Sequence, residues 1–239
     1  MTSVVENFSK VLLKFNVFLR STDLRQYSDV KFKEDGSPVT SADLAIESLL
    51  KGLFNQYLPD FKFVGEESEC TSDFLPNCVV VDPIDGTENF ISGIPIWGVG
   101  IALFVQGQLT ASAVFFPEIA LCKLSSAVDS SCSQGYNLLK GPLSTSRVRA
   151  FSSNSNWLSV IQTFDIENRI LGCSLFNLTL AALDSITFIG SDNGSKLWDI
   201  AAPLLFSLEA GKKILINGKV YHGQFLDPTS RYVVEIINP

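Results

Sequence analysis

Histidine is nearly absent from this sequence, since His222 is the only one among 239 residues. A mechanism in which histidine activates a serine or cysteine nucleophile would therefore depend on this one residue, which stands in a short polar segment near the end of the chain. We interpret His222 as an ordinary loop histidine. The five cysteines are odd in number and show no Cys-x-x-Cys spacing, which argues against a zinc site or a disulfide framework.

Long apolar runs and clusters of basic residues are also missing. No stretch approaches about 18 uninterrupted apolar residues, and the first residues lack the basic segment, apolar run and cleavage site of a secretion signal. The 18 lysines and arginines are scattered among 25 acidic residues and leave a net charge of -7. We therefore expect a cytoplasmic protein that binds neither membranes nor nucleic acids.

The apolar residues that are present predict both helices and a sheet. Hydrophobic residues make up 46% of the chain, enough for a sizeable core in one large domain or two closely packed halves. Helical spacing predicts amphipathic helices over residues 3–20 and 41–57. Short β-rich runs over residues 62–124 predict a sheet of mainly adjacent, antiparallel strands. We therefore expect an α+β half over residues 1–145.

The second half of the chain alternates predicted strands with predicted helices, which is typical of α/β units. The predicted elements are strands at residues 148–151, 170–173 and 186–189, a helix after Ser155, a helix through Leu183 and a last helix over residues 198–210. We therefore expect an α/β half over residues 146–239, which closes a site whose metal ligands come mostly from the first half.

The sharpest motif is the segment Val79-Val80-Val81-Asp82-Pro83-Ile84-Asp85-Gly86-Thr87, an apolar strand that leads into two carboxylates, a glycine and a hydroxyl. Asp82 and Asp85 would share one site, because a hard divalent cation prefers several oxygen ligands and a strand end holds them rigidly. Gly86 would let the backbone approach a bound anion, and Thr87 offers an N–H and a hydroxyl. A simple turn would also explain Asp-Pro and Asp-Gly, but five specified positions favour the functional interpretation.

Three further acids have ordinary structural explanations when each is taken alone. Glu66 follows a short apolar strand, Asp199 opens the last helix, and Asp43 forms a capping box with Thr40. Pro203 favours a position of Asp199 at the helix start, because proline is tolerated near the beginning of a helix. Strand ends that carry Glu66 and the aspartate pair would converge on two metal ions about 3.5–4 Å apart, as in phosphoryl transfer.

In this order the segments resemble the signatures of the inositol monophosphatase family, and the resemblance covers nearly the whole chain. The segments are Val39-Thr40-Ser41-Ala42-Asp43, Gly65-Glu66-Glu67, Asp82 to Thr87 with the following Glu88-Asn89-Phe90 and Gly93-Ile94-Pro95, and Trp198-Asp199-Ile200-Ala201-Ala202. The resemblance implies a mixed α+β and α/β fold, the layered αβαβα sandwich of the inositol monophosphatase and fructose-1,6-bisphosphatase type. It also implies Mg²⁺ dependence, sensitivity to Li⁺ and a homodimer.

The resemblance also assigns roles residue by residue. Two or three Mg²⁺ ions would be bound by Glu66, Asp82, Asp85, Asp199 and the backbone carbonyl of Ile84. Catalysis by a metal-activated water would involve Asp43, Glu66 and Thr87, with the Thr87 hydroxyl hydrogen-bonded to Asp43. The implied substrate contacts are Asp85, Gly86, Thr87, Gly172, Cys173 and Asp192.

These features predict a Mg²⁺-dependent phosphomonoesterase that acts on a small phosphorylated metabolite, first of all inositol monophosphate. Histidinol phosphate, fructose 1,6-bisphosphate and 3′-phosphoadenosine 5′-phosphate stay open as alternatives. The stretch from Lys33 to Asp43 and the segment Pro95-Ile96-Trp97 resemble histidinol-phosphate members as much as inositol members. A non-catalytic regulatory relative is the last alternative, and the intact carboxylates together with Thr87 and Asp43 argue against it.

Overall fold

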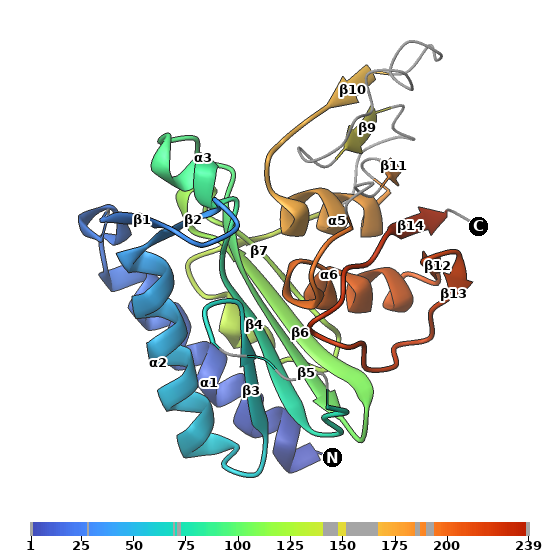
Figure 1. Ribbon diagram of the computed structural model, residues 1–239. Helices are drawn as coiled ribbons and strands as arrows, with labels where there is room; N and C mark the ends of the chain where they lie inside the picture. The colour runs from blue at the N-terminus through green and yellow to red at the C-terminus, as the bar shows by residue number, and fades with distance from the viewer. Residues whose placement is uncertain are drawn as a thin grey trace.

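The structure is a computed structural model that describes residues 2–27, 29–68, 70, 73–140, 148–151, 167–184, 187–189 and 194–237. Its helices and strands form stacked layers (Figure 1). The helices are α1 (Thr2–Ser21), α2 (Ser41–Tyr57), α3 (Thr87–Ile91), α5 (Ser174–Ala182) and α6 (Leu197–Glu209). The expected helices over residues 3–20, 41–57 and 198–210 are confirmed to within one residue at each end. The helix expected after Ser155 lies outside the described residues.

The first large sheet has six strands in the order β3-β4-β5-β6-β7-β8. They are β3 (Lys62–Gly65), β4 (Cys78–Asp85), β5 (Gly98–Val105), β6 (Gln108–Phe116), β7 (Leu121–Leu124) and β8 (Asn137–Leu138). Antiparallel pairing is confirmed from β4 to β7. It is wrong for β3 and β4, which run parallel because the chain returns between them to start β4 beside the beginning of β3.

The second large sheet has the order β10-β9-β11-β14-β12-β13 and mixes parallel with antiparallel pairs. Its strands are β9 (Val148–Phe151), β10 (Glu167–Arg169), β11 (Thr187–Ile189), β12 (Lys213–Ile216), β13 (Lys219–Val220) and β14 (Val234–Ile237). The strand expected over residues 170–173 is wrong, because β10 ends before it and Gly172 has φ +71°, which a strand does not accommodate. A short hairpin, β1 (Val30–Phe32) with β2 (Pro38–Thr40), precedes α2.

Alternating residues bury the first sheet on both faces. On one face Val79, Val81 and Phe115 pack with the apolar stripes of α1 and α2. On the other face Val80, Phe104 and Phe116 pack with α5, α6 and the inner face of the second sheet. Figure 1 shows α1 and α2 on one side of the sheet and α5 and α6 on the other. The expected layered sandwich of helices and sheets is thereby confirmed as the fold class.

The two halves of the chain share one of two hydrophobic clusters, whereas the other cluster, around α1 and α2, belongs to the first half. The core around α5 and α6 joins Val80 of the first sheet with Ile214 and Val234 of the second. A division at residue 145 falls between the two sheets and stays a prediction. Among the described residues, every helix is too short or too polar to cross a lipid bilayer.

Candidate active site

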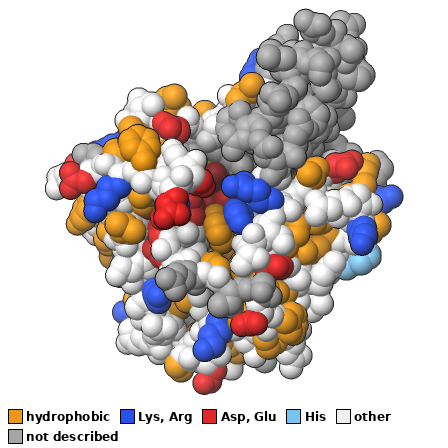
Figure 2. Space-filling model, viewed as in Figure 1, with side chains coloured by type: hydrophobic (Ala, Val, Ile, Leu, Met, Phe, Trp, Pro, Cys, Tyr) orange, Lys and Arg blue, Asp and Glu red, His pale blue; other side chains and the backbone are white. Residues whose placement is uncertain are grey.

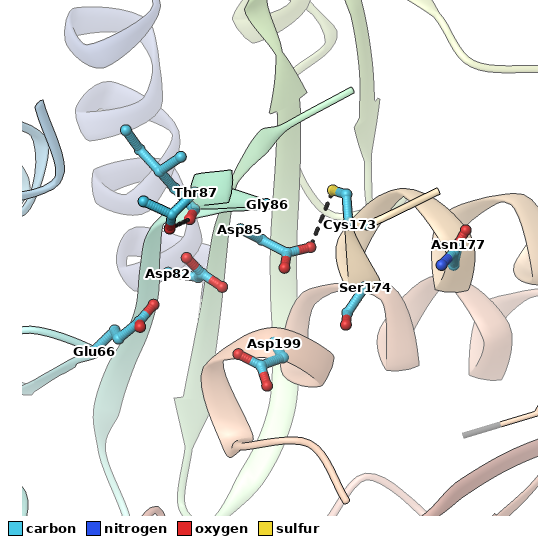
Figure 3. Close-up of a pocket in the computed structure, with 11 residues that line it drawn as sticks. Glu66, Asp82, Asp85, Gly86, Thr87, Cys173, Ser174, Asn177 and Asp199 are labelled. Atoms are coloured by element: carbon cyan, nitrogen blue, oxygen red, sulfur yellow. Dashed lines mark hydrogen bonds between the residues drawn. The ribbon is translucent and has the colours of Figure 1, made fainter. Parts of the chain in front are cut away.

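A cavity of about 150 Å³ lies where β3 and β4 end and where α5 and α6 begin (Figure 3). It brings together nine of the residues singled out in the sequence: Glu66, Asp82, Ile84, Asp85, Gly86, Thr87, Gly172, Cys173 and Asp199. Ser174 and Asn177 complete its wall. Figure 2 shows acidic side chains gathered in and around a hollow on this face of the molecule. Four carboxylates from three segments of the chain therefore face one small space.

The parallel pairing of β3 and β4 places Glu66 beside Asp82. Gly65 and Val81 are register partners, and the Glu66 N–H donates to the Val81 carbonyl oxygen at 3.3 Å. Parallel strands end at the same edge of a sheet, so the next residue of each strand projects from that edge. The parallel pair that the sequence did not predict is thus what joins the two acidic motifs.

An irregularity in β4 turns Asp82 and Asp85 toward the same cavity. Residues three apart in a regular strand face opposite sides of the sheet. Here Asp82 lies opposite Gly100 and Asp85 opposite Gly98, so two residues of β4 bulge against one residue of β5. A bulge re-aims side chains and also tolerates a proline, because part of the ladder of hydrogen bonds is interrupted. Asp82 and Asp85 consequently lie side by side in Figure 3.

Gly86 turns the chain from β4 into α3 with φ +86°. A Cβ atom built on it would lie 3.1 Å from the Gly172 carbonyl oxygen and 3.2 Å from the Ile96 carbonyl oxygen. Both the backbone angle and the close approach of two carbonyl groups therefore require glycine. The following residue, Thr87, opens α3, and its Oγ1 donates to the Ile84 carbonyl oxygen at 2.9 Å.

Asp85 binds to the beginning of α5. Its Oδ2 accepts a hydrogen bond from the Cys173 thiol at 3.0 Å and another from the Leu175 N–H. The first turn of a helix favours a carboxylate because its N–H groups are unsatisfied within the helix. Burial raises the pKa of Asp85 to about 6, although the bonds from Cys173 and Leu175 oppose that rise. This contact draws the cysteine segment, distant in sequence, into the cavity.

Asp199 is the third residue of α6, and its Oδ2 accepts the Lys196 N–H at 2.8 Å. The prediction that Asp199 stands at the helix start is confirmed. The prediction about Pro203 is wrong, because proline is the seventh residue of the helix rather than one of the first. Since proline has no N–H, it cannot donate to the carbonyl of Asp199 four residues earlier.

Asp82 is the most isolated acid of the cavity. Its side chain is buried, and neither carboxylate oxygen has a hydrogen-bond partner among the described residues. Burial raises the pKa of Asp82 well above its ordinary value, and the charge of Glu66 raises it further. Burial likewise raises the pKa of Asp199, with Asp85 as the next cause. The cavity therefore concentrates negative charge that the protein itself leaves poorly compensated.

Asp43 lies behind this cavity rather than in its wall. It is buried, and its Oδ2 accepts hydrogen bonds from N and Oγ1 of Thr40 at 2.8 and 2.5 Å. The family resemblance implied a hydrogen bond between Thr87 and Asp43, and this implication is wrong. Thr87 donates to the Ile84 carbonyl oxygen instead, and Asp43 takes part in the capping box of α2. Burial raises the pKa of Asp43 to about 6 against the hydrogen bonds from Thr40.

Lys33 supplies a positive charge beside Glu66. Its ammonium lies 2.7 Å from Glu66 Oε1 and 2.6 Å from Glu67 Oε1. Burial works to lower the lysine pKa, but the two carboxylates outweigh burial and raise it. Glu67 has its own pKa raised to about 7, with burial as the largest cause. The pairing connects the hairpin of β1 and β2 with the acidic edge of the sheet.

A wider cleft of about 930 Å³ opens beside the cavity and shares Glu66, Gly86, Thr87 and Gly172 with it. Its other walls include Asp35, Glu88, Ile94, Ile170 and Arg231. The sequence did not single out Arg231, because no pattern around it distinguishes it from other surface arginines. Asp192, expected to contact substrate, lies outside the described residues. His222 is exposed and lines neither space, as expected of a loop residue.

The donor set of the cavity fits Mg²⁺, which takes oxygen ligands and above all carboxylates. Asp82 supports this fit, because a buried carboxylate without a hydrogen-bond partner in the described parts of the chain calls for a cation. Within the described parts of the chain, no three His, Cys, Asp or Glu side chains are already grouped in a way that could hold a metal ion. Other acids of the cavity accept hydrogen bonds from the protein instead: Glu66 accepts one from the Lys33 ammonium, and Asp199 accepts one from the Lys196 N–H. Cation binding would therefore require these side chains to exchange partners.

Comparison with known proteins adds three findings. A sequence profile described as the inositol monophosphatase family matches residues 16–235. A histidinol-phosphatase of Chlorobaculum parvum is 37% identical over 95 residues, which cover 40% of this chain and only 37% of that protein. An inositol-1-monophosphatase of Mesorhizobium japonicum is 26% identical over 239 residues, which cover 83% of this chain and 82% of that protein.

Among solved structures, an IMPase/NADP phosphatase complexed with Mg²⁺ and phosphate superimposes with a TM-score of 0.70. The match covers 93% of this chain and 86% of that chain, at 18% sequence identity. At this identity the likeness concerns the fold alone.

Proposed function

The chain belongs to the inositol monophosphatase family, and we propose that it is a Mg²⁺-dependent phosphomonoesterase of a small polyol or sugar phosphate. In the reaction one water adds its oxygen to phosphorus, the bond from phosphorus to the alcohol oxygen breaks, and the alcohol leaves with a proton. The observation that carries the proposal is the set of four carboxylates around one cavity, in which Asp82 is buried and has no hydrogen-bond partner among the residues that the structure describes. Inositol 1-phosphate is the substrate we place first.

Mg²⁺, when bound, supplies charge that stabilises phosphoryl oxygens and lowers the pKa of a water. We assign its ligands to residues that line the cavity: Glu66, Asp82, Asp85, Asp199 and the carbonyl of Ile84, for two or three ions. A carbonyl oxygen has two lone pairs, so the Ile84 carbonyl can accept the hydrogen bond from Thr87 and still coordinate a cation. The strand ends and helix starts hold these oxygens on rigid elements, which favours pre-organised binding.

Asp43, Glu66 and Thr87 are the residues we assign to catalysis. The Thr87 hydroxyl donates a hydrogen bond to the Ile84 carbonyl oxygen, so its lone pairs remain able to accept a hydrogen bond from the attacking water. Glu66 would hold that water as well as a cation. Asp43 would act through its charge, since its carboxylate and that of Glu66 are close enough to raise the Asp43 pKa.

The substrate would lie across the boundary of the cavity and the wider cleft. Gly86 and Thr87 stand at the start of α3, and we expect their N–H groups to bind phosphate oxygens. Asp85, Gly172 and Cys173 would meet the alcohol part or its phosphate from the side of α5. Asp192 stays a proposed contact from the sequence resemblance.

One observation favours histidinol phosphate as the second candidate. The cleft carries the acids Asp35, Glu66 and Glu88 against the single cation Arg231 among its described wall residues. Apolar walls at Ile94 and Ile170 accompany them. An amino alcohol with an aromatic ring would match both features better than a neutral polyol, and it would do so through charge complementarity. The charge balance disfavours bisphosphates and nucleotides.

The test is phosphate release from inositol 1-phosphate, histidinol phosphate and fructose 1,6-bisphosphate, each with Mg²⁺ and with EDTA. We expect release that EDTA abolishes, at the highest kcat/KM for one of the first two substrates. A rate for histidinol phosphate far above that for inositol 1-phosphate would make the second candidate the function. Absence of release from all three would transfer the proposal to another phosphoester or to a non-catalytic relative.

Three further properties accompany this proposal. We expect Li⁺ at tens of millimolar to inhibit turnover at fixed Mg²⁺, because it would compete for a carboxylate site. We expect a homodimer, to be measured by light scattering coupled to size-exclusion chromatography. A cytoplasmic location is supported by the five cysteines, which are all free thiols, as is usual in reducing compartments.

A further inference from the structure

Glu47 is a buried carboxylate of α2 that the candidate site does not include. It lies one helical turn after Asp43, and only 5% of its surface is exposed. It contributes nothing to the wall of the cavity. A buried acid is costly unless donors satisfy it, so the partners of Glu47 show what its charge is used for.

Both oxygens of Glu47 bind the segment that carries Glu66. Oε2 accepts the Glu67 N–H at 2.9 Å, and Oε1 accepts the Ser68 hydroxyl at 2.6 Å. Hydrogen bonds to an ionised acceptor are about twice as strong as those between neutral groups. The two bonds therefore tie the chain immediately after Glu66 to the rigid helix α2.

Gly65, the residue before Glu66, packs against the Glu47 carboxylate as well. A Cβ atom built on Gly65 would lie 2.4 Å from Glu47 Oε2, so only glycine lets the strand end pass this closely. Thus Gly65, before Glu66, packs against Glu47, and Glu67, after Glu66, donates a hydrogen bond to Glu47. The backbone bond from Glu66 to Val81 is long, at 3.3 Å, and cannot fix the turn alone.

We propose that Glu47 is a positioning residue, which holds the turn from Gly65 to Ser68 so that the Glu66 carboxylate faces the cavity and binds the cation. The inference rests on the proposed function, since that cation is the Mg²⁺ of the phosphatase. Glu47 does not line the cavity and acts through the Glu67 N–H and the Ser68 hydroxyl that it binds. Its loss would cost cation affinity before it costs the chemical step.

The test measures Mg²⁺ binding by calorimetry, together with the Mg²⁺ dependence of turnover, in Glu47→Ala and Glu47→Gln. We expect Glu47→Ala to weaken Mg²⁺ binding about tenfold, with most of kcat recovered at saturating Mg²⁺. Glutamine keeps an acceptor for the Glu67 N–H, and its amide can donate to Ser68, so Glu47→Gln should lose about threefold. Such rescue by the conservative variant is not expected of a residue that only fills space.

Glu209 offers a matched control far along α6. Its Oε1 accepts N–H and hydroxyl of Ser126 at 2.8 and 2.7 Å, which repeats the bonding of Glu47 in an exposed place. Glu209→Gln should leave Mg²⁺ binding unchanged. If Glu47→Ala does not fold, Ser68→Ala removes one of the two bonds and should weaken Mg²⁺ binding about twofold to threefold, in parallel with Glu47→Gln.

The outcomes separate this inference from the proposed function. Mg²⁺ dissociation constants within twofold of wild type in the folded Glu47 variants would overturn the positioning role and leave the phosphatase proposal intact. Wild-type protein that binds Mg²⁺ but releases no phosphate would overturn the phosphatase, while the binding data on the variants still decide the role of Glu47. Wild-type protein that binds no Mg²⁺ would overturn both.

Discussion

Aspartates in exposed turns and aspartates in the cavity are held in opposite ways. Asp35, Asp129 and Asp227 each accept a backbone N–H and a hydroxyl from the serine or threonine two residues later. These hydrogen bonds, the hydroxyl first, lower the pKa of all three. Asp82 is buried and Asp199 half-buried instead, and the loss of solvent raises the pKa of both well above the ordinary value.

The difference separates acids whose charge stabilises the fold from acids whose charge destabilises it. A turn aspartate gains its partners from its own neighbourhood, so its charge stabilises the folded chain. The cavity acids come from the end of β3, from β4 and from α6, and the charges of Glu66 and Asp85 raise the pKa of both Asp82 and Asp199. Clustered charge that destabilises the empty site is what a cation site requires, because binding then relieves the repulsion.

The largest effect should come from Asp82→Asn, which removes a central cavity charge. We expect Mg²⁺-dependent turnover to fall at least about 100-fold, since a proposed ligand is lost. In EDTA the melting temperature should be at least that of wild type, because one of four mutually repelling carboxylates is gone. Near wild-type turnover, measured as phosphate release, would refute the assignment of Asp82. Asp227→Asn is the control in a turn, and its turnover should be unchanged.

We expect Mg²⁺ to raise the stability only of a chain that keeps all four carboxylates of the cavity. At a Mg²⁺ concentration about 100 times the dissociation constant, binding adds about 2.7 kcal/mol of stability. For a chain of this length, that corresponds to a rise of roughly 5–11 °C in melting temperature. Thermal unfolding with Mg²⁺ and with EDTA measures this rise. Asp82→Asn should lose most of it, whereas a rise equal to that of wild type would show that Mg²⁺ stabilises the protein elsewhere.

Much of the fold could be predicted from the sequence because local patterns determine it. Helical spacing locates α1 and α2, and Thr40 marks the start of α2 together with Asp43. The apolar run before Asp82 locates β4, since a strand buried on both faces reads as continuous hydrophobic residues. These signals lie within a few residues of the elements that they predict.

What the sequence did not predict depends on partners that are distant along the chain. The parallel pairing of β3 and β4 and the donation from Thr87 to Ile84 are choices among alternatives that only the folded backbone decides. Glu47 looks in the sequence like any polar position of a helix, because its bonds to Glu67 and Ser68 form only after the chain returns. The acidic motifs are visible in the sequence, but their convergence is expected from the family resemblance.

Two glycines of similar backbone angle test how much the close approach at the site matters. Gly86 has φ +86° and lies against two carbonyl oxygens, while Gly218 has φ +75° in a hairpin turn, where a Cβ atom would meet no other atom within 4 Å. Alanine at either place costs about 1–2 kcal/mol for the left-handed backbone. We expect Gly86→Ala to lose more stability than Gly218→Ala and to lose turnover about tenfold. Equal losses in the free energy of unfolding, measured with urea, would mean that the two carbonyl groups move aside to make room for the alanine side chain.

The smallest effect should come from Asp129→Ala, which removes a carboxylate that serves only its turn. Asp129 accepts the Ser131 N–H at 2.8 Å and the Ser131 hydroxyl at 2.7 Å, so alanine should lower the melting temperature slightly and leave turnover and Mg²⁺ affinity unchanged. The pKa of Asp129 is lowered in the fold, so its contribution is complete at pH 7 and is lost as the pH falls below about 3.9. Urea unfolding of wild type and variant at pH 7 measures the difference. An effect of Asp129→Ala on Mg²⁺ affinity would mean that turn acids and cavity acids are not independent, because sites without shared partners should otherwise act additively.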